Sequence, residues 1–213
     1  MIFDFHTHRE PQIPYKALVN CSPEVLATKS LEGYYSVGIH PWNVQQAVGS
    51  EEYWQNFSSL LSRPEVLAVG EAGIDRSSGV LLDVQEAFFV QQIRVSEELG
   101  KPLIIHAVHA DDRMLYLRKK MKPSQPWAVH GFRAKPVAMK SYLEAGFYIS
   151  FGERCNEESL RQIPADRLFL ETDESMLPIE EIYERAAKVR NVSSKELEGQ
   201  LAANLYRFFG RVL

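Results

Sequence analysis

Short apolar runs alternate with amphipathic stretches along almost the whole chain. Runs this continuously apolar are typical of β-strands buried on both faces, as in a parallel sheet. Eight such runs occur, at Met1–Phe5, Ala17–Asn20, Tyr34–Ile39, Val66–Gly70, Leu103–Ile105, Trp127–Val129, Phe147–Ser150 and Leu168–Leu170. The pattern therefore predicts eight strands in a parallel arrangement.

Several segments between the runs carry helix signals. Ser50 is a candidate N-cap for a helix with Phe57 and Leu61 on its apolar face. Pro136 suits the first position of another helix, and Gly146 suits its end. These positions predict helices in the segments that separate the strands.

A further helix is expected to bury Val84, Phe88, Val95 and Leu99, which fall on one face. Strands that alternate with helices in this way indicate an α/β protein, and eight of them indicate a (β/α)₈ TIM barrel. A chain of 213 residues suits one such domain, so residues 1–213 are expected to form a single barrel.

The alternation has one gap, between His8 and Lys16. The segment is too short for a crossover helix, and Pro11 and Pro14 would interrupt one. The predicted barrel is therefore irregular, with an extended loop where the helix between strands 1 and 2 is missing.

Side chains of metal-ligand type stand where several runs end. His6 and His8 are two residues apart, so on a strand they point to the same side and can bind one ion. Later runs end in the same kind of residue, at Glu71, His106, His130 and Asp173. Imidazole and carboxylate groups suit a divalent cation in a hydrolase. Because barrel active sites lie at the carboxyl ends of the strands, these residues predict one metal centre.

Composition narrows the range of partners and locations. The net charge of −4 does not provide the basic face that sequence-independent binding to duplex nucleic acid requires. No apolar run is long enough for a bilayer span, and no secretory leader is evident, so a cytoplasmic protein without a membrane partner is expected. Cys21 and Cys155 are too few for a disulfide framework, which fits a reducing compartment. No obligate protein partner is evident.

Seven segments of the chain resemble the TatD family of metal-dependent deoxyribonucleases, within the amidohydrolase-like superfamily. They are FDFHTH, YSVGIHPW, VGEAGID, KPLIIHA, VHGF, IPADRLFLETD and AANLYRFFG. These segments extend from the first residues almost to the last, so the resemblance covers the whole chain. Their order also matches the superfamily, with paired histidines on strand one and an aspartate on strand eight.

The resemblance implies two divalent metal ions, of zinc, magnesium or manganese. One ion would be held by His6, His8, Glu71 and Asp173, and the second by Glu71, His106 and His130. Glu71 would bridge the ions, and Asp173 would act as the general base on a metal-activated water. The implied reaction is hydrolysis of a phosphodiester, with 3′-directed trimming of DNA ends.

Other polar residues near the strand ends are candidates for substrate contacts. His40 ends the third strand and suits either a phosphate contact or a structural role. Arg133 and Lys135 follow His130, and both are expected either to contact substrate phosphates or to stand in a solvated loop. Glu171 shares a strand end with Asp173 and is left out of the predicted site, since it could equally pair with a base.

The chain departs from the family pattern in two loops. The helix after strand one is missing, and the segment after Asp173 is shorter than the family's usual loop. Both changes border the substrate opening, so the chemistry is expected to transfer better than the substrate. Alternative functions are hydrolysis of a small phosphoester, lactone or amide, and a catalytically inactive metal-binding barrel.

Overall fold

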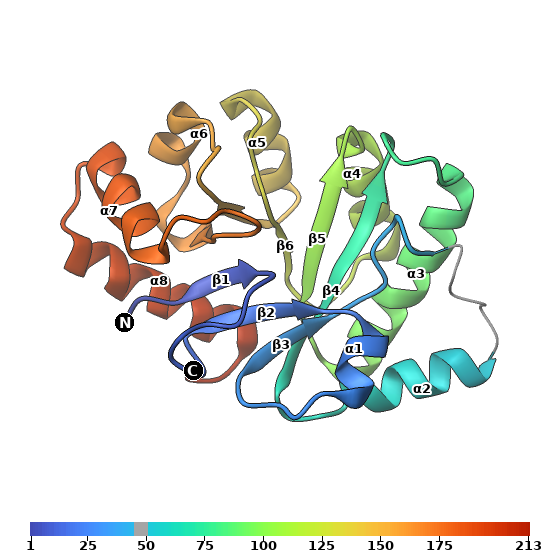
Figure 1. Ribbon diagram of the computed structural model, residues 1–213. Helices are drawn as coiled ribbons and strands as arrows, with labels where there is room; N and C mark the ends of the chain where they lie inside the picture. The colour runs from blue at the N-terminus through green and yellow to red at the C-terminus, as the bar shows by residue number, and fades with distance from the viewer. Residues whose placement is uncertain (45–50) are drawn as a thin grey trace.

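The computed structural model describes residues 1–44 and 51–213. Ser50, the predicted N-cap, lies outside the described residues. One eight-stranded sheet runs through the molecule in chain order, and every neighbouring pair of strands is parallel. The strands are β1 Asp4–Thr7, β2 Ala17–Cys21, β3 Tyr34–Val37, β4 Val66–Asp75, β5 Leu103–Val108, β6 Trp127–Val129, β7 Tyr148–Phe151 and β8 Leu168–Leu170 (Figure 1). The predicted TIM barrel is confirmed.

The first and last strands meet and nearly close the barrel. A parallel bridge joins Thr7 to Asp173, just beyond the end of β8. The amide of Asp173 donates to the carbonyl of His6 at 2.9 Å, and the amide of His8 donates to the carbonyl of Asp173 at 3.3 Å. The residues that close the barrel are therefore among the predicted metal ligands.

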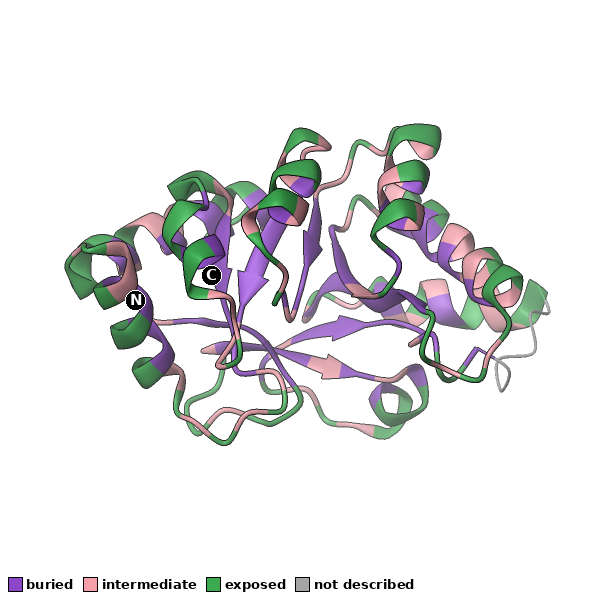
Figure 2. Ribbon diagram, turned by 90° about the horizontal axis from the view of Figure 1, so that it is seen from above, coloured by how far each residue is buried: buried purple, intermediate pink, exposed green. Residues whose placement is uncertain are grey.

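Helices cover the outer face of the sheet, and their exposed sides form the periphery of the molecule (Figure 2). They are α1 Pro23–Thr28, α2 Glu51–Leu61, α3 Leu82–Leu99, α4 Asp111–Met121, α5 Pro136–Glu144, α6 Glu157–Gln162, α7 Ile179–Arg190 and α8 Ser194–Phe209, with a 3₁₀ turn, η1, at Ala165–Arg167. Between β1 and β2 the described residues contain no helix, as predicted. No helix among the described residues is long and apolar enough to cross a membrane.

The strand boundaries differ from the apolar runs in two places that matter for the site. β1 begins at Asp4, and its register with β2 is irregular between Asp4 and Thr7. β4 continues to Asp75, so Glu71 lies within the strand and not at its end. The apolar run predicts a strand that ends before Glu71, because a charged residue normally marks the end of a buried strand. Glu71 is nevertheless only 3% exposed inside the barrel.

Helix α3 buries a different face from the one that its apolar residues predict. Of that predicted face only Val95 is buried, while Gln85 and Gln92 are each 1% exposed. Gln92 accepts a hydrogen bond from the amide of Ile39 and donates to its carbonyl. The glutamines can be buried because the backbone where β3 and β4 end satisfies their amides.

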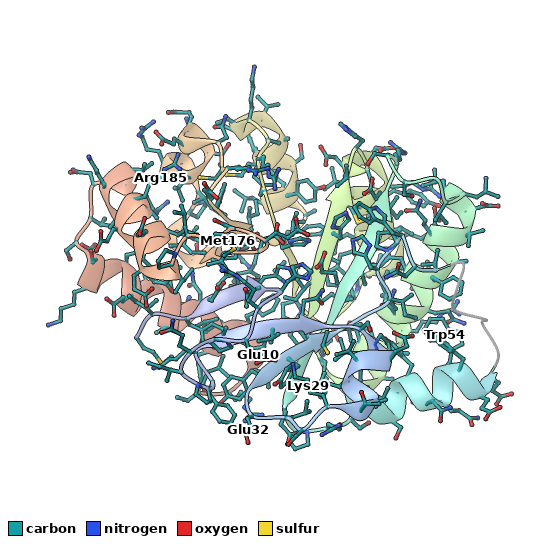
Figure 3. All side chains as sticks on the ribbon, viewed as in Figure 1. Glu10, Lys29, Glu32, Trp54, Met176 and Arg185 are labelled. Carbon is teal, nitrogen blue, oxygen red and sulfur yellow. The ribbon has the colours of Figure 1, made fainter. Side chains whose placement is uncertain are left out.

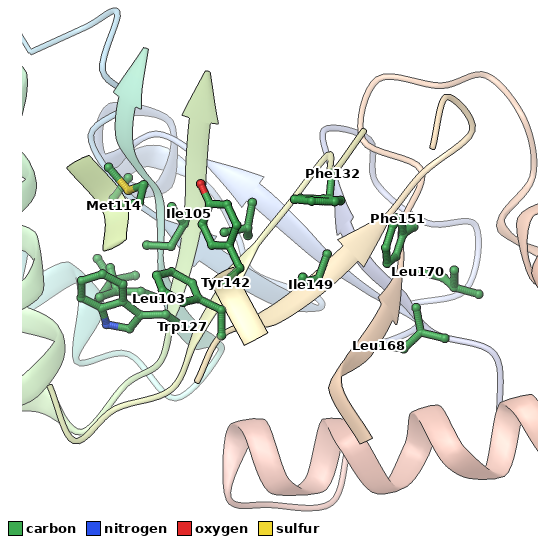
Figure 4. Packing of buried hydrophobic residues seen from close by; sticks show 14 of the residues in the cluster. Leu103, Ile105, Met114, Trp127, Phe132, Tyr142, Ile149, Phe151, Leu168 and Leu170 are labelled. Atoms are coloured by element: carbon green, nitrogen blue, oxygen red, sulfur yellow. The ribbon is translucent and has the colours of Figure 1, made fainter. Parts of the chain in front are cut away.

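The apolar core has two layers, one on each side of the sheet. Between the sheet and the helices, Trp127 of β6 packs against Phe147 and Tyr142 of α5 packs nearby (Figure 4). Inside the barrel, the rings of Phe5 and Phe169 stack with centroids 3.9 Å apart. The barrel interior is therefore apolar at one end, and the polar cluster occupies the opposite end.

Candidate metal centre

Glu71 lies at the centre of a group of four histidines from three other strands and strand ends. Its Oε1 is 3.2 Å from His6 Nε2 and 3.0 Å from His8 Nε2. Its Oε2 is 3.2 Å from His106 Nδ1 and 2.9 Å from His130 Nε2. One carboxylate thus faces two separate imidazole pairs, one with each oxygen.

Asp173 completes the cluster from the end of β8. Its Oδ1 lies 3.4 Å from His8 Nε2 and 3.8 Å from His6 Nε2, on the same side as the first histidine pair. His6, His130 and Asp173 also place ligand-type atoms within 4.8 Å of one another. The structure therefore brings together all six residues that the sequence and the resemblance place at the metal centre.

His40 lies within the cluster and not at its edge. It lies beside His106 with ring centroids 4.4 Å apart, and its Nε2 is 3.7 Å from Glu71 Oε2. Burial, followed by the charge of His106, lowers the pKa of His40 to about 4. An imidazole that stays neutral near neutral pH is the form in which histidine binds a metal ion.

Close backbone approaches explain why glycines flank Glu71. A Cβ on Gly70 would lie 2.7 Å from the Cβ of Ile104, and one on Gly73 would lie 2.0 Å from the carbonyl oxygen of His106. Gly70 and Gly73 also have φ values of +152° and +153°, which side chains disfavour. Glycine at both positions lets β4 approach β5, so Glu71 and His106 reach the same space.

Asn20, at the end of β2, holds Glu71 in place and was not predicted. Its Nδ2 donates to Glu71 Oε1 at 2.9 Å, while its Oδ1 accepts from the amide of Glu71 at 2.9 Å. The side chain thus fixes both the carboxylate and the backbone of the central residue. The sequence signal was available, because Asn20 is a polar residue that ends an apolar run, like the histidines.

Asp75 is a second residue that the sequence analysis missed. It is 1% exposed, and its Oδ2 lies 3.4 Å from His106 Nε2 and accepts from Trp42 Nε1 at 2.6 Å. Residues 71, 73 and 75 alternate along β4, so strand parity with Glu71 would have placed Asp75 on the site side. A carboxylate at one imidazole nitrogen leaves the other nitrogen oriented toward the cluster.

Glu171, which the prediction left out, lies behind His130. It is fully buried, its Oε1 accepts from the amide of Gly131, and the same oxygen lies 3.8 Å from His130 Nδ1. Among the described residues, His130 is the one basic side chain that forms an ion pair with Glu171. Glu171 therefore supports the orientation of His130 without lying at the centre of the cluster.

The charges of the cluster compensate one another. Burial alone would raise the pKa of Glu71, but the surrounding imidazoles, His130 first, hold it well below 4.5. Burial also opposes a charged His130, yet the charge of Glu71 keeps its pKa well above 6.5. Hydrogen bonds with Asp173 and Glu71 raise the pKa of His8 to about 10. The carboxylates are therefore ionised at neutral pH, as metal binding requires.

The residues present fit a divalent cation. Within the described part of the chain, both ring nitrogens of the buried His6 and Nδ1 of His130 lack a hydrogen-bond partner. Buried polar atoms without partners are costly and call for a functional explanation. Imidazole nitrogens gathered around two carboxylates form a donor set that suits a divalent cation.

The cluster opens into a cavity of about 1140 Å³ at the carboxyl ends of the strands. Arg133 lines this cavity, whereas Lys135 is exposed at the N-terminus of α5 and is not among the lining residues. On the rim, Glu10 of the loop after β1 forms an ion pair with Lys29, which follows α1 (Figure 3). Of the three predicted candidates for phosphate contacts, His40 and Arg133 line the cavity and Lys135 does not.

An eight-stranded parallel barrel with histidines and carboxylates gathered at the carboxyl ends of its strands defines a metal-dependent hydrolase. The family model described as TatD related DNase matches residues 20–210. The chain belongs to this TatD-related DNase family, which confirms the resemblance that the sequence motifs indicate.

Individual relatives agree with this assignment. The 3′-5′ ssDNA/RNA exonuclease TatD of Shigella flexneri is 30% identical over 176 residues, covering 78% of this chain and 67% of the relative. The enzyme of the same name from Erwinia billingiae is 32% identical over 187 residues, covering 82% and 70%. Among solved structures, the TatD homologue YjjV from Escherichia coli K12 superposes with a TM-score of 0.82 at 18% identity, covering 98% of this chain and 97% of that chain, which shows the same fold.

Proposed function

We propose that the protein is a two-metal phosphodiesterase that removes nucleotides from the 3′ end of single-stranded DNA. The observation that carries this proposal is the placement of Glu71, whose two oxygens each face a separate pair of imidazoles. A bridging carboxylate suits two nearby cations because it places negative charge between them. The names of the relatives, which are exonucleases on single-stranded DNA and RNA, support the substrate class.

We assign the first ion to the residues around Glu71 Oε1 and the second to those around Oε2. The first set is His6, His8, Glu71 and Asp173, and the second is Glu71, His106 and His130, with His40 beside it. Bound divalent ions supply charge stabilisation for a phosphoryl group and lower the pKa of water. Ligand preference favours zinc over manganese and magnesium at this nitrogen-rich donor set.

The residues of the chain would then divide the remaining work. Asp173, ionised and facing the cavity, accepts the proton of the water that attacks phosphorus. Arg133 binds a non-bridging phosphate oxygen from the cavity wall, because a guanidinium matches phosphate geometry. The bond that breaks joins phosphorus to the 3′ oxygen of the preceding nucleotide, and that oxygen takes a proton from solvent water and leaves as a 3′ hydroxyl.

The test is cleavage of single-stranded DNA labelled at either end, in EDTA and in Mg²⁺, Mn²⁺ or Zn²⁺. We expect metal-dependent shortening from the 3′ end, which falls at least ~1000-fold in Glu71→Ala and Asp173→Asn. Glu184→Gln, a change at an exposed carboxylate on α7, is the matched control and should cleave like the native protein.

Model substrates decide between the proposed function and its nearest alternative. Small phosphoesters, lactones and amides are assayed beside the oligonucleotides under the same metal conditions. Faster turnover of a small ester than of DNA would replace the nuclease assignment with a small-molecule hydrolase. A metal-loaded protein that turns over none of these substrates would leave a binding function.

A further inference from the structure

We propose that Trp42 is a stacking platform for one nucleobase of the strand that is cut, beside the metal centre. This inference rests on the proposed function and deepens it, because it names a residue that selects for a base. Trp42 follows β3 and lines the same cavity as Glu71 and His106. Its ring centroid lies 6.4 Å from that of His106, so a base on the indole would lie within one nucleotide of the cluster.

Packing among the described residues leaves Trp42 largely exposed. The indole is 59% exposed, whereas Trp127 is fully buried and Trp54 packs against Phe57 and Phe88. Large aromatic side chains normally contribute to stability by burying their surface. An exposed indole on the wall of a polar cavity therefore indicates a ligand with a flat face.

The ring is held in one orientation although it is exposed. Its Nε1 donates to the buried Asp75 at 2.6 Å, and its backbone amide donates to Nδ1 of His40 at 3.3 Å. The His40 ring packs against it edge-on, at 5.0 Å and 89°. A side chain that is already ordered loses little conformational entropy on binding, so more of the contact energy of its face contributes to affinity.

The charge of the cavity makes stacking more important for binding. Proteins that bind single strands combine cationic grooves with aromatic platforms. Apart from the histidines of the metal centre, the basic side chains that line the cavity are Arg133 and Lys29, and Lys29 is already paired with Glu10. The chain as a whole carries a net charge of −4. Away from the metal centre the cavity wall therefore offers little electrostatic attraction to the nucleic-acid backbone, and a base on Trp42 would add affinity there.

A simpler role for Trp42 would be structural, since its indole N–H orients Asp75 and through it His106. The two roles are separable with substrates that lack one base. The experiment measures kcat/KM for a single-stranded oligonucleotide and for copies with one abasic residue at each of the last three positions. Each substrate is assayed with the native protein, Trp42→Leu and Trp42→Phe.

We expect one abasic position to lower kcat/KM of the native protein by about 10-fold, since stacking of a base on an aromatic ring is worth 1–3 kcal/mol. The same base removal should change kcat/KM of Trp42→Leu by less than about 2-fold. Trp42→Phe keeps a ring face without the N–H, so it should retain most of the base dependence.

Substrate binding in the absence of turnover provides a second test of the platform. In EDTA, the intact oligonucleotide should quench indole fluorescence of the native protein, and Trp42→Leu should lose that quenching. Equal base dependence in native protein and Trp42→Leu, in an enzyme that cleaves DNA, would overturn the platform and leave the proposed function standing. Absence of cleavage with every metal would overturn the proposed function, and the platform with it.

Discussion

Asn20 contacts Glu71 with both ends of its amide. The amide nitrogen meets the Glu71 carboxylate, and the amide oxygen meets the Glu71 backbone N–H. A buried carboxylate between imidazoles would otherwise have several orientations of similar energy, and only some of them direct one oxygen to each histidine pair. Ligand affinity at such centres depends on the residues that orient the ligands as well as on the ligands themselves.

Asn20→Ala should weaken metal binding while leaving the fold in place. Loss of the orienting contacts typically lowers affinity about 10–100-fold. Calorimetric titration of the metal-free protein with Zn²⁺ or Mn²⁺ measures the change. Asn56→Ala, at an exposed position of α2, is the matched control. Equal affinities for both variants would show that Asn20 does not support the centre.

The protons on the cluster predict how metal binding depends on pH. The pKa of His8 is raised to about 10, so this imidazole carries its proton at pH 7, and a metal ion must displace it. Affinity should therefore rise with pH from 7 toward 10. Titrations in buffers of different ionisation enthalpy should show release of at least about one proton per ion bound at pH 7. Binding without proton release would contradict this arrangement.

At the scale of elements, the sequence predicts the positions of the strands better than it predicts which polar side chains the strands and helices bury. Each strand lies close to one of the apolar runs, because residues buried on both faces are apolar throughout. The interior of β4 escaped prediction, since Glu71 and Asp75 are polar residues of a strand that is wholly buried. The buried face of α3 escaped for the same reason, because Gln85 and Gln92 are buried through hydrogen bonds that no apolar pattern encodes.

The Gln92 contacts with Ile39 predict a loss of stability when the amide is removed. Gln92→Leu leaves a buried backbone N–H and carbonyl unpaired, which costs about 2 kcal/mol or more of unfolding free energy. Urea unfolding measures the loss. Gln55→Leu, the same change at an exposed position of α2, should alter the unfolding free energy by less than about 0.5 kcal/mol.

At the scale of the whole molecule, one end of the barrel interior is apolar and the other carries the charged cluster. The stacked rings of Phe5 and Phe169 come from β1 and β8, the two strands that also position His6, within β1, and Asp173, just beyond the end of β8. The overall architecture can be predicted from the sequence because most of the apolar runs that form strands are followed by a polar residue that lies in or near the site. The loops follow less well, and the cavity wall formed by Trp42 had no signal in the apolar pattern.

Removal of metal should lower the stability of the entire barrel, because the cluster joins strands from both ends of the chain. Ligand bound at 100 times its dissociation constant adds about 2.7 kcal/mol to the unfolding free energy. Thermal unfolding should therefore begin at a lower temperature in EDTA than with Zn²⁺ or Mn²⁺. Glu71→Ala should show little of this difference, and an equal shift in that variant would place the stabilising ion elsewhere.

The bridge between Thr7 and Asp173 also bears on how the protein is made. His6 and His8 are synthesised well before Asp173, so they meet this aspartate only after the last strand has been synthesised. Until then the set of ligands is incomplete, and the bridge that joins the first and last strands cannot form. Closure of the barrel and completion of the ligand set therefore depend on the same residue, Asp173.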